Sequence, residues 1–183
     1  MYDFNQDYIT ECNRTSDINE HLPTLDRLAK DCKHITEFGV RDGVSTTVWL
    51  NNDVEIVSYD LYPTPRANFI FSQANTAGKP AQYIIGDIRA LQDIEETDLL
   101  FVDSHHIYEQ CSFELTNFGN KARKYIVFHD TVLFGRRGEH HGDGLLLAIA
   151  EFLVSNTHWT VKEHYTNNNG LTVLERKIPS IIG

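Results

Sequence analysis

The sequence predicts an α/β fold, in which a mostly parallel β-sheet is covered by helices on both of its faces. Three observations support this prediction: apolar, β-branched segments alternate with segments of helical periodicity, a glycine turn follows the first apolar segment, and several apolar segments end in an acidic residue. In such sheets ligands bind beyond the carboxyl ends of the strands, so the ends of these segments are the candidate functional positions.

Seven segments have the composition of strands, because each is a short run of apolar and β-branched residues that ends at a turn or an acid. In chain order they cover residues 35–38, 55–61, 82–88, 98–103, 124–130, 160–164 and 171–175. Helical segments separate the first five, which predicts parallel pairing. The last two are joined by the turn-forming sequence Asn167-Asn168-Asn169-Gly170, which predicts an antiparallel hairpin.

Helices are expected where apolar residues recur at intervals of three or four. These segments cover residues 22–32, from 44 onward, 67–77, 108–118 and 145–154. Pro23 suits a first helical turn, and Gly119 ends the helix before the fifth strand. Residues 145–154 are apolar nearly all round, which predicts a buried helix, whereas residues 1–20 are polar and aperiodic.

Length and composition are those of a soluble globular protein. The 183 residues predict one domain, with residues 1–33 as an N-terminal lid or packing segment and residues 34–176 as the core. Hydrophobic residues make up 41% of the chain and charged residues 23%. The net charge of -10 argues against binding to nucleic acid or to an anionic membrane.

A cytoplasmic location is expected from the absence of export signals. No apolar run approaches the roughly 18 residues that span a membrane, and the first residues, MYDFNQDY, lack the basic and apolar parts of a signal peptide. Cys12, Cys32 and Cys111 are odd in number and show no CxxC spacing, which favours reduced thiols.

The glycine turn after the first strand reads Glu37-x-Gly39-x3-Gly43-x-Ser45. A phosphate-binding P-loop needs four residues between its glycines and then Lys-Ser/Thr, and the dinucleotide fingerprint needs glycines where this turn has Arg41 and Val44. The turn instead resembles the first motif of the class I S-adenosylmethionine-dependent methyltransferases. That resemblance implies a Rossmann-like fold and assigns Glu37, Gly39, Gly43 and Ser45 to the cofactor site. Alternatively, any strand-to-helix turn of an α/β protein can carry two glycines.

Acids at later strand ends extend this cofactor site. Asp60 lies 21 residues beyond Gly39, close to the roughly 20 expected for an acid that binds a ribose. Asp87 ends the third predicted strand, and the resemblance implies that it contacts the adenine amino group. Asp87 could equally cap the short helix that follows. Asp103, at the end of the fourth strand, is the last cofactor candidate.

Two further motifs narrow the resemblance. Asp103-Ser-His-His106-Ile-Tyr108-Glu109 and the later Phe128-His129-Asp130-Thr131 resemble the macrocin-type O-methyltransferases and the cephalosporin-hydroxylase-like proteins. Members that hold Mg²⁺ bind it with the first Asp and an adjacent acidic pair, so the resemblance implies a cation at Asp103, His129 and Asp130. His129 replaces an acid, which shifts the preference from Mg²⁺ toward Mn²⁺, Fe²⁺ or Zn²⁺. Strand alternation predicts that His129 points away from Asp130 and into the core.

The expected activity is methyl transfer from S-adenosylmethionine to a hydroxyl of a small-molecule acceptor. His106 and Asp130 are the catalytic candidates: Asp130 would help to bind a cation, and His106, or alternatively His129, would take the acceptor proton. In the alternative, His106 only bonds across its loop and His140 and His141 are solvated. A homodimer could complete the acceptor pocket. Two other functions stay open, a cofactor-binding protein without turnover and a metal-dependent hydrolase or hydroxylase on the same fold.

Overall fold

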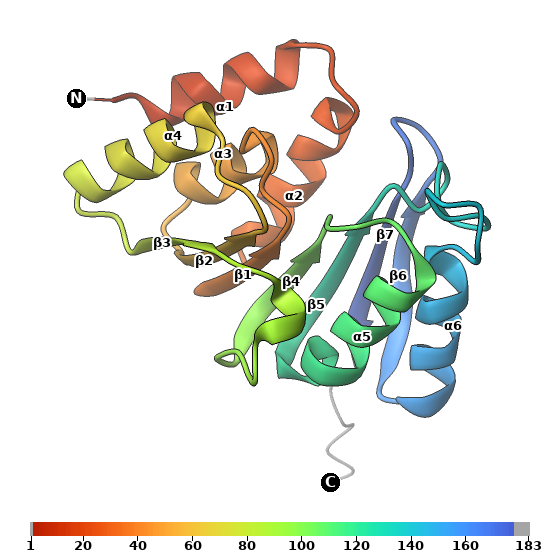
Figure 1. Cartoon of the computed structure of the whole chain (residues 1–183). Helices are drawn as coiled ribbons and strands as arrows, with labels where there is room; N and C mark the ends of the chain where they lie inside the picture. The colour runs from red at the N-terminus through yellow and green to blue at the C-terminus, as the bar shows by residue number, and fades with distance from the viewer. Residues whose placement is uncertain (1, 178–183) are drawn as a thin grey trace, which may run out of the picture.

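The computed structural model describes residues 2–177 and contains a seven-stranded sheet with helices on both faces (Figure 1). The strands are β1 (His34–Phe38), β2 (Glu55–Asp60), β3 (Ala81–Ile85), β4 (Thr97–Val102), β5 (Ala122–His129), β6 (Trp159–Tyr165) and β7 (Leu171–Arg176). The α-helices are α1 (Phe4–Asn13), α2 (Leu22–Ala29), α3 (Val44–Asn51), α4 (Pro65–Thr76), α5 (Tyr108–Phe118) and α6 (Leu145–Ser155). Short 3₁₀ helices are η1 (Asn19–His21), η2 (Ile88–Ala90) and η3 (Gly119–Lys121).

The strand order is β3-β2-β1-β4-β5-β7-β6. The first five strands pair in parallel, and β7 pairs antiparallel with both β5 and β6. The predicted α/β fold, with its mostly parallel sheet and C-terminal hairpin, is therefore confirmed. The order reverses between β1 and β4, and the carboxyl ends of these neighbouring strands are where such sheets bind ligands.

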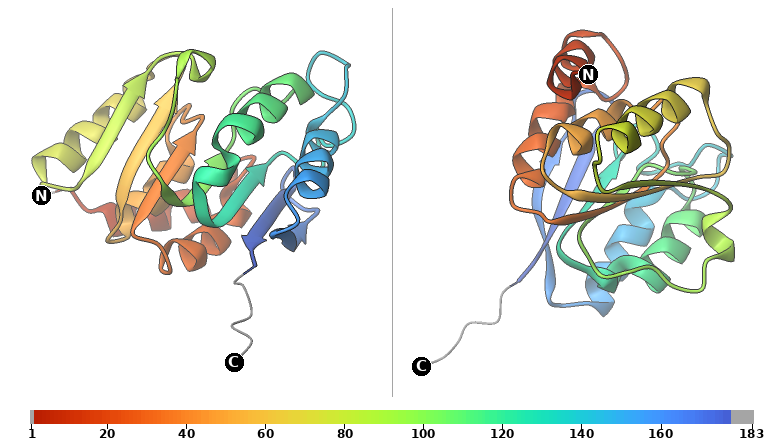
Figure 2. Two further views of the ribbon diagram at one scale, coloured as in Figure 1. Left: turned by 90° about the horizontal axis from the view of Figure 1, so that it is seen from below. Right: turned by 90° about the vertical axis from the view of Figure 1, so that its left-hand side faces the viewer.

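Two apolar cores lie on opposite faces of the sheet (Figure 2). Helices α2, α3 and α4 pack on one face, with α1 against α3, whereas α5 and α6 pack on the other. Strand β4 supplies both cores by alternation, because Leu99 and Phe101 belong to the first and Leu100 and Val102 to the second. Continuous apolar runs are typical of parallel strands that are buried on both faces.

Helix α1 was not expected, because residues 1–20 were interpreted as polar and aperiodic, although Phe4, Tyr8 and Cys12 recur at intervals of four and pack against the first core. Its start is capped by Asp3, whose side chain accepts a hydrogen bond from the backbone N–H of Gln6. Its buried residue is an acid, Glu11, which forms an ion pair of 2.7 Å with Arg66 of α4. Capping, ion pairing and these partly buried side chains hold the helix, and its spacing of four is the signal that the sequence interpretation missed.

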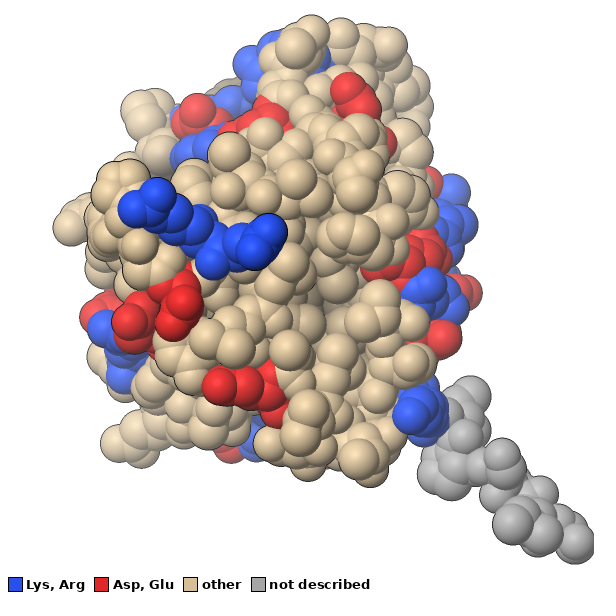
Figure 3. All heavy atoms as spheres, turned by 90° about the vertical axis from the view of Figure 1, so that its right-hand side faces the viewer, with Lys and Arg blue, Asp and Glu red and all other residues tan. Residues whose placement is uncertain are grey.

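Helix α6 is only half-buried, which corrects the expectation of a fully buried helix. Leu145, Ala148, Ile149 and Phe152 face the sheet, whereas Val154 is 80% exposed. The helix covers one face near the edge of the sheet and packs against its neighbour α5. Figure 3 views the molecule from the side on which α6 lies and shows broad areas without charged side chains.

Within the described part of the chain, none of the helices combines the length and the apolarity needed to cross a bilayer.

Candidate active site

A cavity of about 620 Å³ opens at the carboxyl ends of the parallel strands. Five of the seven predicted cofactor residues line it: Gly39, Ser45, Asp60, Asp87 and Asp103. His106 lines the same cavity, so the cavity contains both predicted cofactor residues and one of the two predicted catalytic residues. A volume of this size suits a small-molecule cofactor.

Glu37 lies below the cavity and does not line it, although the resemblance assigned it to the cofactor site. Its side chain is fully buried in β1 and accepts four hydrogen bonds of 2.6–2.9 Å. The donors are the hydroxyls of Ser45, Thr46 and Ser58 and the indole N–H of Trp49. Burial raises the pKa of the Glu37 carboxyl, and these donors oppose the rise. Glu37 therefore ties the start of α3 to the sheet.

Asp60 fixes the glycine turn from the end of β2. One carboxylate oxygen accepts hydrogen bonds from the backbone N–H groups of Val40, at 2.8 Å, and Arg41, at 2.7 Å. The other oxygen accepts from the N–H of Tyr62 at 3.0 Å. A carboxylate offers about four acceptor positions, so Asp60 keeps capacity for one further donor in the cavity.

Both glycines of the turn have a positive φ, and Gly39 also packs directly against the backbone of another strand end. Gly39 has φ +87°, and a Cβ there would lie 2.0 Å from the backbone oxygen of Asp103 at the end of β4. Gly43 has φ +70°, and a Cβ there would lie 2.5 Å from the Cδ1 of Ile70 in α4. Glycine tolerates this backbone region without strain. The turn can therefore approach both β4 and α4 closely.

Asp87 lies two residues beyond the end of β3, so the predicted third strand was too long. Its carboxylate accepts a hydrogen bond of 2.8 Å from the backbone N–H of Arg89 and caps η2. The predicted capping role is thus present, and Asp87 also lines the cavity.

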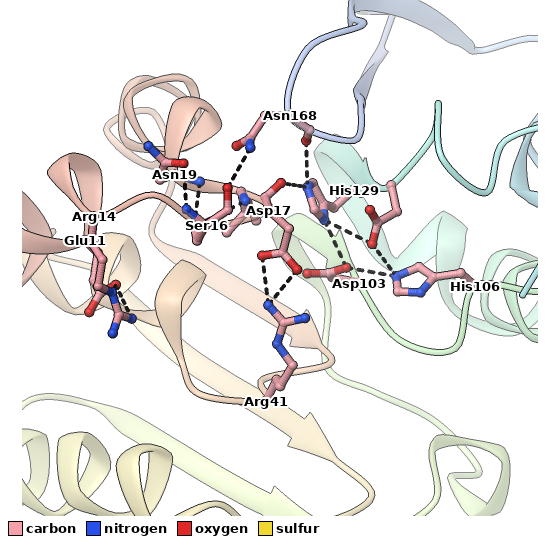
Figure 4. Close-up of polar contacts among 12 residues, drawn as sticks. Glu11, Arg14, Ser16, Asp17, Asn19, Arg41, Asp103, His106, His129 and Asn168 are labelled. Atoms are coloured by element: carbon pink, nitrogen blue, oxygen red, sulfur yellow. Dashed lines mark hydrogen bonds and ion pairs between the residues drawn. The ribbon is translucent and has the colours of Figure 1, made fainter.

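The predicted metal-binding and catalytic residues form one cluster (Figure 4), of which Asp103 and His106 line the cavity whereas His129 and Asp130 do not. His106 Nε2 lies 3.1 Å from Asp103 Oδ1 and 3.0 Å from Asp130 Oδ2. His129 Nδ1 lies 3.3 Å and 3.4 Å from the same two oxygens. Each imidazole therefore contacts both carboxylates.

The protonation of this cluster follows from its contacts. Burial lowers the pKa of His106 and of His129, but hydrogen bonds to Asp103 and Asp130 outweigh it and raise each pKa to about 10. Burial raises the pKa of both aspartates, but the bonds from the imidazoles hold each pKa below its usual value. These contacts favour the protonated form of both imidazoles and the ionised form of both aspartates.

The prediction that His129 points into the core, away from Asp130, is wrong. His129 is only 1% exposed, yet its Nδ1 faces the cluster. The reason is the backbone of Asp130, which has φ +59° and leaves the strand conformation. Strand alternation ends at this residue, so consecutive side chains turn toward the same point.

Sequence reasoning missed three segments that surround the cluster. Glu139 Oε1 lies 2.5 Å from His106 Nδ1 and lines the cavity. The backbone oxygens of Asp17 and Asn168 lie 3.0 Å and 3.3 Å from His129 Nε2. Asp17 also forms an ion pair of 2.8 Å with Arg41 (Figure 4). Backbone acceptors leave no sequence pattern, whereas Glu139 belongs to the polar loop between β5 and α6.

The sequence matches no family model and no curated protein. Its structure is similar to a methyltransferase of Podospora anserina bound to S-adenosylhomocysteine, with 18% identity over 97% of this chain and 89% of that chain and a TM-score of 0.67. An O-methyltransferase of Bacillus cereus, also bound to S-adenosylhomocysteine, is 14% identical over 97% and 92%, with a TM-score of 0.68. This chain has the fold of the class I methyltransferases.

A third similar structure is an N-methyltransferase, NodS of Bradyrhizobium japonicum, in complex with S-adenosylhomocysteine. It is 16% identical over 97% of this chain and all of that one, with a TM-score of 0.63. The methyltransferase fold is thus shared by proteins that methylate different atoms, and the acceptor must be argued from the site.

Proposed function

We propose that this protein is an S-adenosylmethionine-dependent methyltransferase that methylates a hydroxyl of a small-molecule acceptor. The observation that carries the proposal is that one cavity joins a turn pinned by Asp60 to Asp103 and His106, and that His106 in turn contacts the buried Asp130. A methyltransferase must bind its donor and activate its acceptor within a few ångströms of each other, and this cavity offers both kinds of group.

The donor half of the cavity would bind the cofactor by its polar ends. Asp60 is proposed to accept a hydrogen bond from a ribose hydroxyl with its remaining acceptor position, and Asp87 one from the adenine amino group. Gly39 and Ser45 would form the wall between them. Glu37 would act only through the turn that it holds, because its oxygens are occupied by protein donors.

The acceptor half combines charge neutralisation with proton removal. The sulfonium of the donor already carries the activation, so the chain must align the hydroxyl and help to remove its proton. Asp103, His129 and Asp130 would hold a divalent cation, which supplies Lewis acidity toward the hydroxyl when bound. Asp130 Oδ1, which is buried and has no hydrogen-bond partner within residues 2–177, supports the fit of such a cation.

His106 is proposed to orient the cluster, since both of its ring nitrogens contact carboxylates. Proton removal is assigned instead to His105, which lines the cavity and is less buried than His106. Its Nε2 contacts His140 Nε2 at 3.1 Å, so a proton accepted by His105 could pass to the loop between β5 and α6.

The test has two parts, donor binding and transfer. Calorimetry should detect S-adenosylhomocysteine binding, and the Asp60→Ala variant should bind at least about tenfold more weakly, since one charge-assisted bond contributes roughly 1.5–3 kcal/mol. Asp53→Ala, an exposed substitution outside the cavity, is the control. Transfer of labelled methyl groups to a panel of small hydroxylated compounds, beside matched amines, tests the acceptor. No binding of S-adenosylhomocysteine, or transfer to amines alone, would refute the proposal.

We also propose a cytoplasmic homodimer. Cys12, Cys32 and Cys111 are free, as expected in a reducing compartment. The outer side of α6 exposes Leu147 and Val154, which a second copy could cover. Sedimentation of the parent protein and of Leu147→Glu tests this, because the charge should produce monomers.

A further inference from the structure

We propose that Glu114 is a positioning residue that fixes Ser104 and Gln110 as hydrogen-bond acceptors for the adenine amino group of the cofactor, so that the cavity rejects a purine with a carbonyl in that place. This inference rests on the proposed function, because it names a further specificity determinant of the same cofactor site. Three observations carry it: the hydrogen bonds of Glu114, an unpartnered oxygen on the same carboxyl, and the position of Ser104 and Gln110 in the cavity.

Glu114 is a fully buried acid on helix α5. Its side chain is 0% exposed and does not line the cavity, whereas its partners Ser104 and Gln110 do. Ser104 Oγ donates a hydrogen bond of 2.6 Å to Glu114 Oε1, and Gln110 Nε2 donates one of 2.8 Å to the same oxygen. Burying an ionisable group is costly, and its neighbours Cys111, Leu115 and Phe118 belong to the second apolar core. The role of this acid therefore lies in the two side chains that it binds.

The two hydrogen bonds decide what Ser104 and Gln110 can offer to a ligand. A carboxylate oxygen only accepts, so Ser104 directs its single hydrogen at Glu114 and its oxygen accepts from other groups. Gln110 directs its N–H₂ at Glu114, which leaves its amide oxygen as an acceptor. Burial raises the pKa of the Glu114 carboxyl to about 7. A proton taken up near that pH goes to Oε2, because Oε1 already receives two donors, so both bonds persist.

The second oxygen of Glu114 determines how a glutamine would behave in its place. Glu114 Oε2 is buried and has no hydrogen-bond partner among the described residues 2–177. An amide N–H₂ at that position would be a buried donor without an acceptor, which is costly. Glu114→Gln should therefore turn its N–H₂ toward Ser104 and Gln110. Each of them would then accept from residue 114 and have a hydrogen left to donate into the cavity.

The ligand group that fits these acceptors is an amino group. Ser104 follows β4, and Gln110 lies in the first turn of α5, which packs against η2. Asp87 caps η2 and lines the same cavity, and Arg89 of η2 lies close enough to Glu114 to lower its pKa. The adenine amino group carries two hydrogens, one for Asp87 and one for Ser104 or Gln110. A carbonyl in its place has only lone pairs and would face acceptors alone.

The test compares S-adenosylhomocysteine with S-inosylhomocysteine, in which a carbonyl replaces the adenine amino group, by calorimetry on the whole chain. The parent should bind the carbonyl analogue at least about a hundredfold more weakly. In Glu114→Gln, Ser104 and Gln110 can donate to the carbonyl, so the ratio of the two dissociation constants should fall at least about tenfold. Glu109→Gln is the matched control, because it removes the same charge from an exposed position of α5 outside the cavity and should keep the parent ratio.

The ratio separates positioning from stability, because a variant that only loosens the fold weakens the binding of both ligands alike. An unchanged ratio in Glu114→Gln, or equal binding of the two ligands by the parent, would overturn the proposal.

Ser104→Ala covers the case in which Glu114→Gln fails to fold. It removes one of the acceptors that Glu114 fixes, so the ratio should fall by at least about threefold, and an unchanged ratio would refute the role of Glu114 through Ser104. A parent protein that binds no S-adenosylhomocysteine would refute the proposed function and this inference with it. Normal binding with the parent ratio in the variants would refute this inference alone.

Discussion

Replacing Glu37 tests whether a buried acid outside the cavity holds the cofactor turn. The side chain is 0% exposed and accepts hydrogen bonds from three hydroxyls and one indole N–H. Leucine in its place would leave all four donors without their acceptor. Hydroxyls can rotate toward other oxygens, but the N–H of Trp49 cannot.

The expected losses follow from these contacts. An unpaired buried donor costs roughly 1–3 kcal/mol, so four donors with partial rearrangement give a loss of about 4 kcal/mol for Glu37→Leu. At about 2–4 °C per kcal/mol for a chain of this size, the melting temperature should fall by about 8–16 °C. Glu37→Gln keeps one oxygen for Trp49 and Ser45, and its amide can donate to the hydroxyls of Thr46 and Ser58. Its loss should be about 1–2 kcal/mol.

Thermal unfolding of the parent and of both variants measures these losses of stability. Calorimetry with S-adenosylhomocysteine measures whether the turn still binds the cofactor with the affinity of the parent. The glutamine variant should bind within roughly threefold of the parent, which corresponds to less than 1 kcal/mol. A leucine variant as stable as the parent would show that the four bonds contribute nothing. A glutamine variant that folds normally but cannot bind would place Glu37 in direct contact with the cofactor.

Three further predictions concern the turn and the cluster. Asp60→Ala should lower the melting temperature as well as cofactor affinity, because three backbone N–H groups lose their acceptor; unfolding at the parent temperature would contradict this. Gly39→Ala should destabilise far more than Gly142→Ala, since a Cβ at Gly142 meets nothing within 4 Å; equal melting temperatures would show that the turn relaxes freely. In protein kept free of metal with EDTA, the hydrogen bonds to Asp103 and Asp130 raise the pKa of His106 and of His129 from 6.5 to about 10. The stability that these bonds add to the folded protein is therefore complete below pH 6.5 and is lost as the pH rises through about 10. Melting curves in EDTA should show this decline, and a constant melting temperature across that range would refute it.

The strands of the sheet could be predicted from the sequence because the signal for each strand lies within the strand itself. Each buried strand is a short apolar run, and Asp60 and Asp103 follow their strands at the expected edge. The sequence predicted that Glu37 precedes the glycine turn, but its role as a buried acceptor of four hydrogen bonds was missed. Ser45, Thr46 and Trp49 are polar-tipped residues at buried positions of α3, and that cluster in the sequence is the signal of a buried acceptor.

Other features depend on the surroundings of an element, which a sequence pattern does not contain. The ion pair between Glu11 and Arg66 joins residues 55 positions apart, so nothing near α1 predicts it. The exposure of Val154 follows from the place of α6 near the sheet edge rather than from its composition. The apolar content of a segment therefore predicts full burial only when other elements cover both sides of that segment.

The cluster shows why the alternation rule failed where the chemistry is concentrated. Alternation holds only while the backbone stays extended, and Asp130 leaves that conformation directly after β5. Aspartate is one of the few residues other than glycine that adopt positive φ at modest cost. An aspartate at this position can therefore turn the chain and supply a carboxylate at once, so that its side chain and that of His129 reach the same point. A strand end followed by Asp is thus a place where side-chain direction should be left open when a site is predicted from sequence.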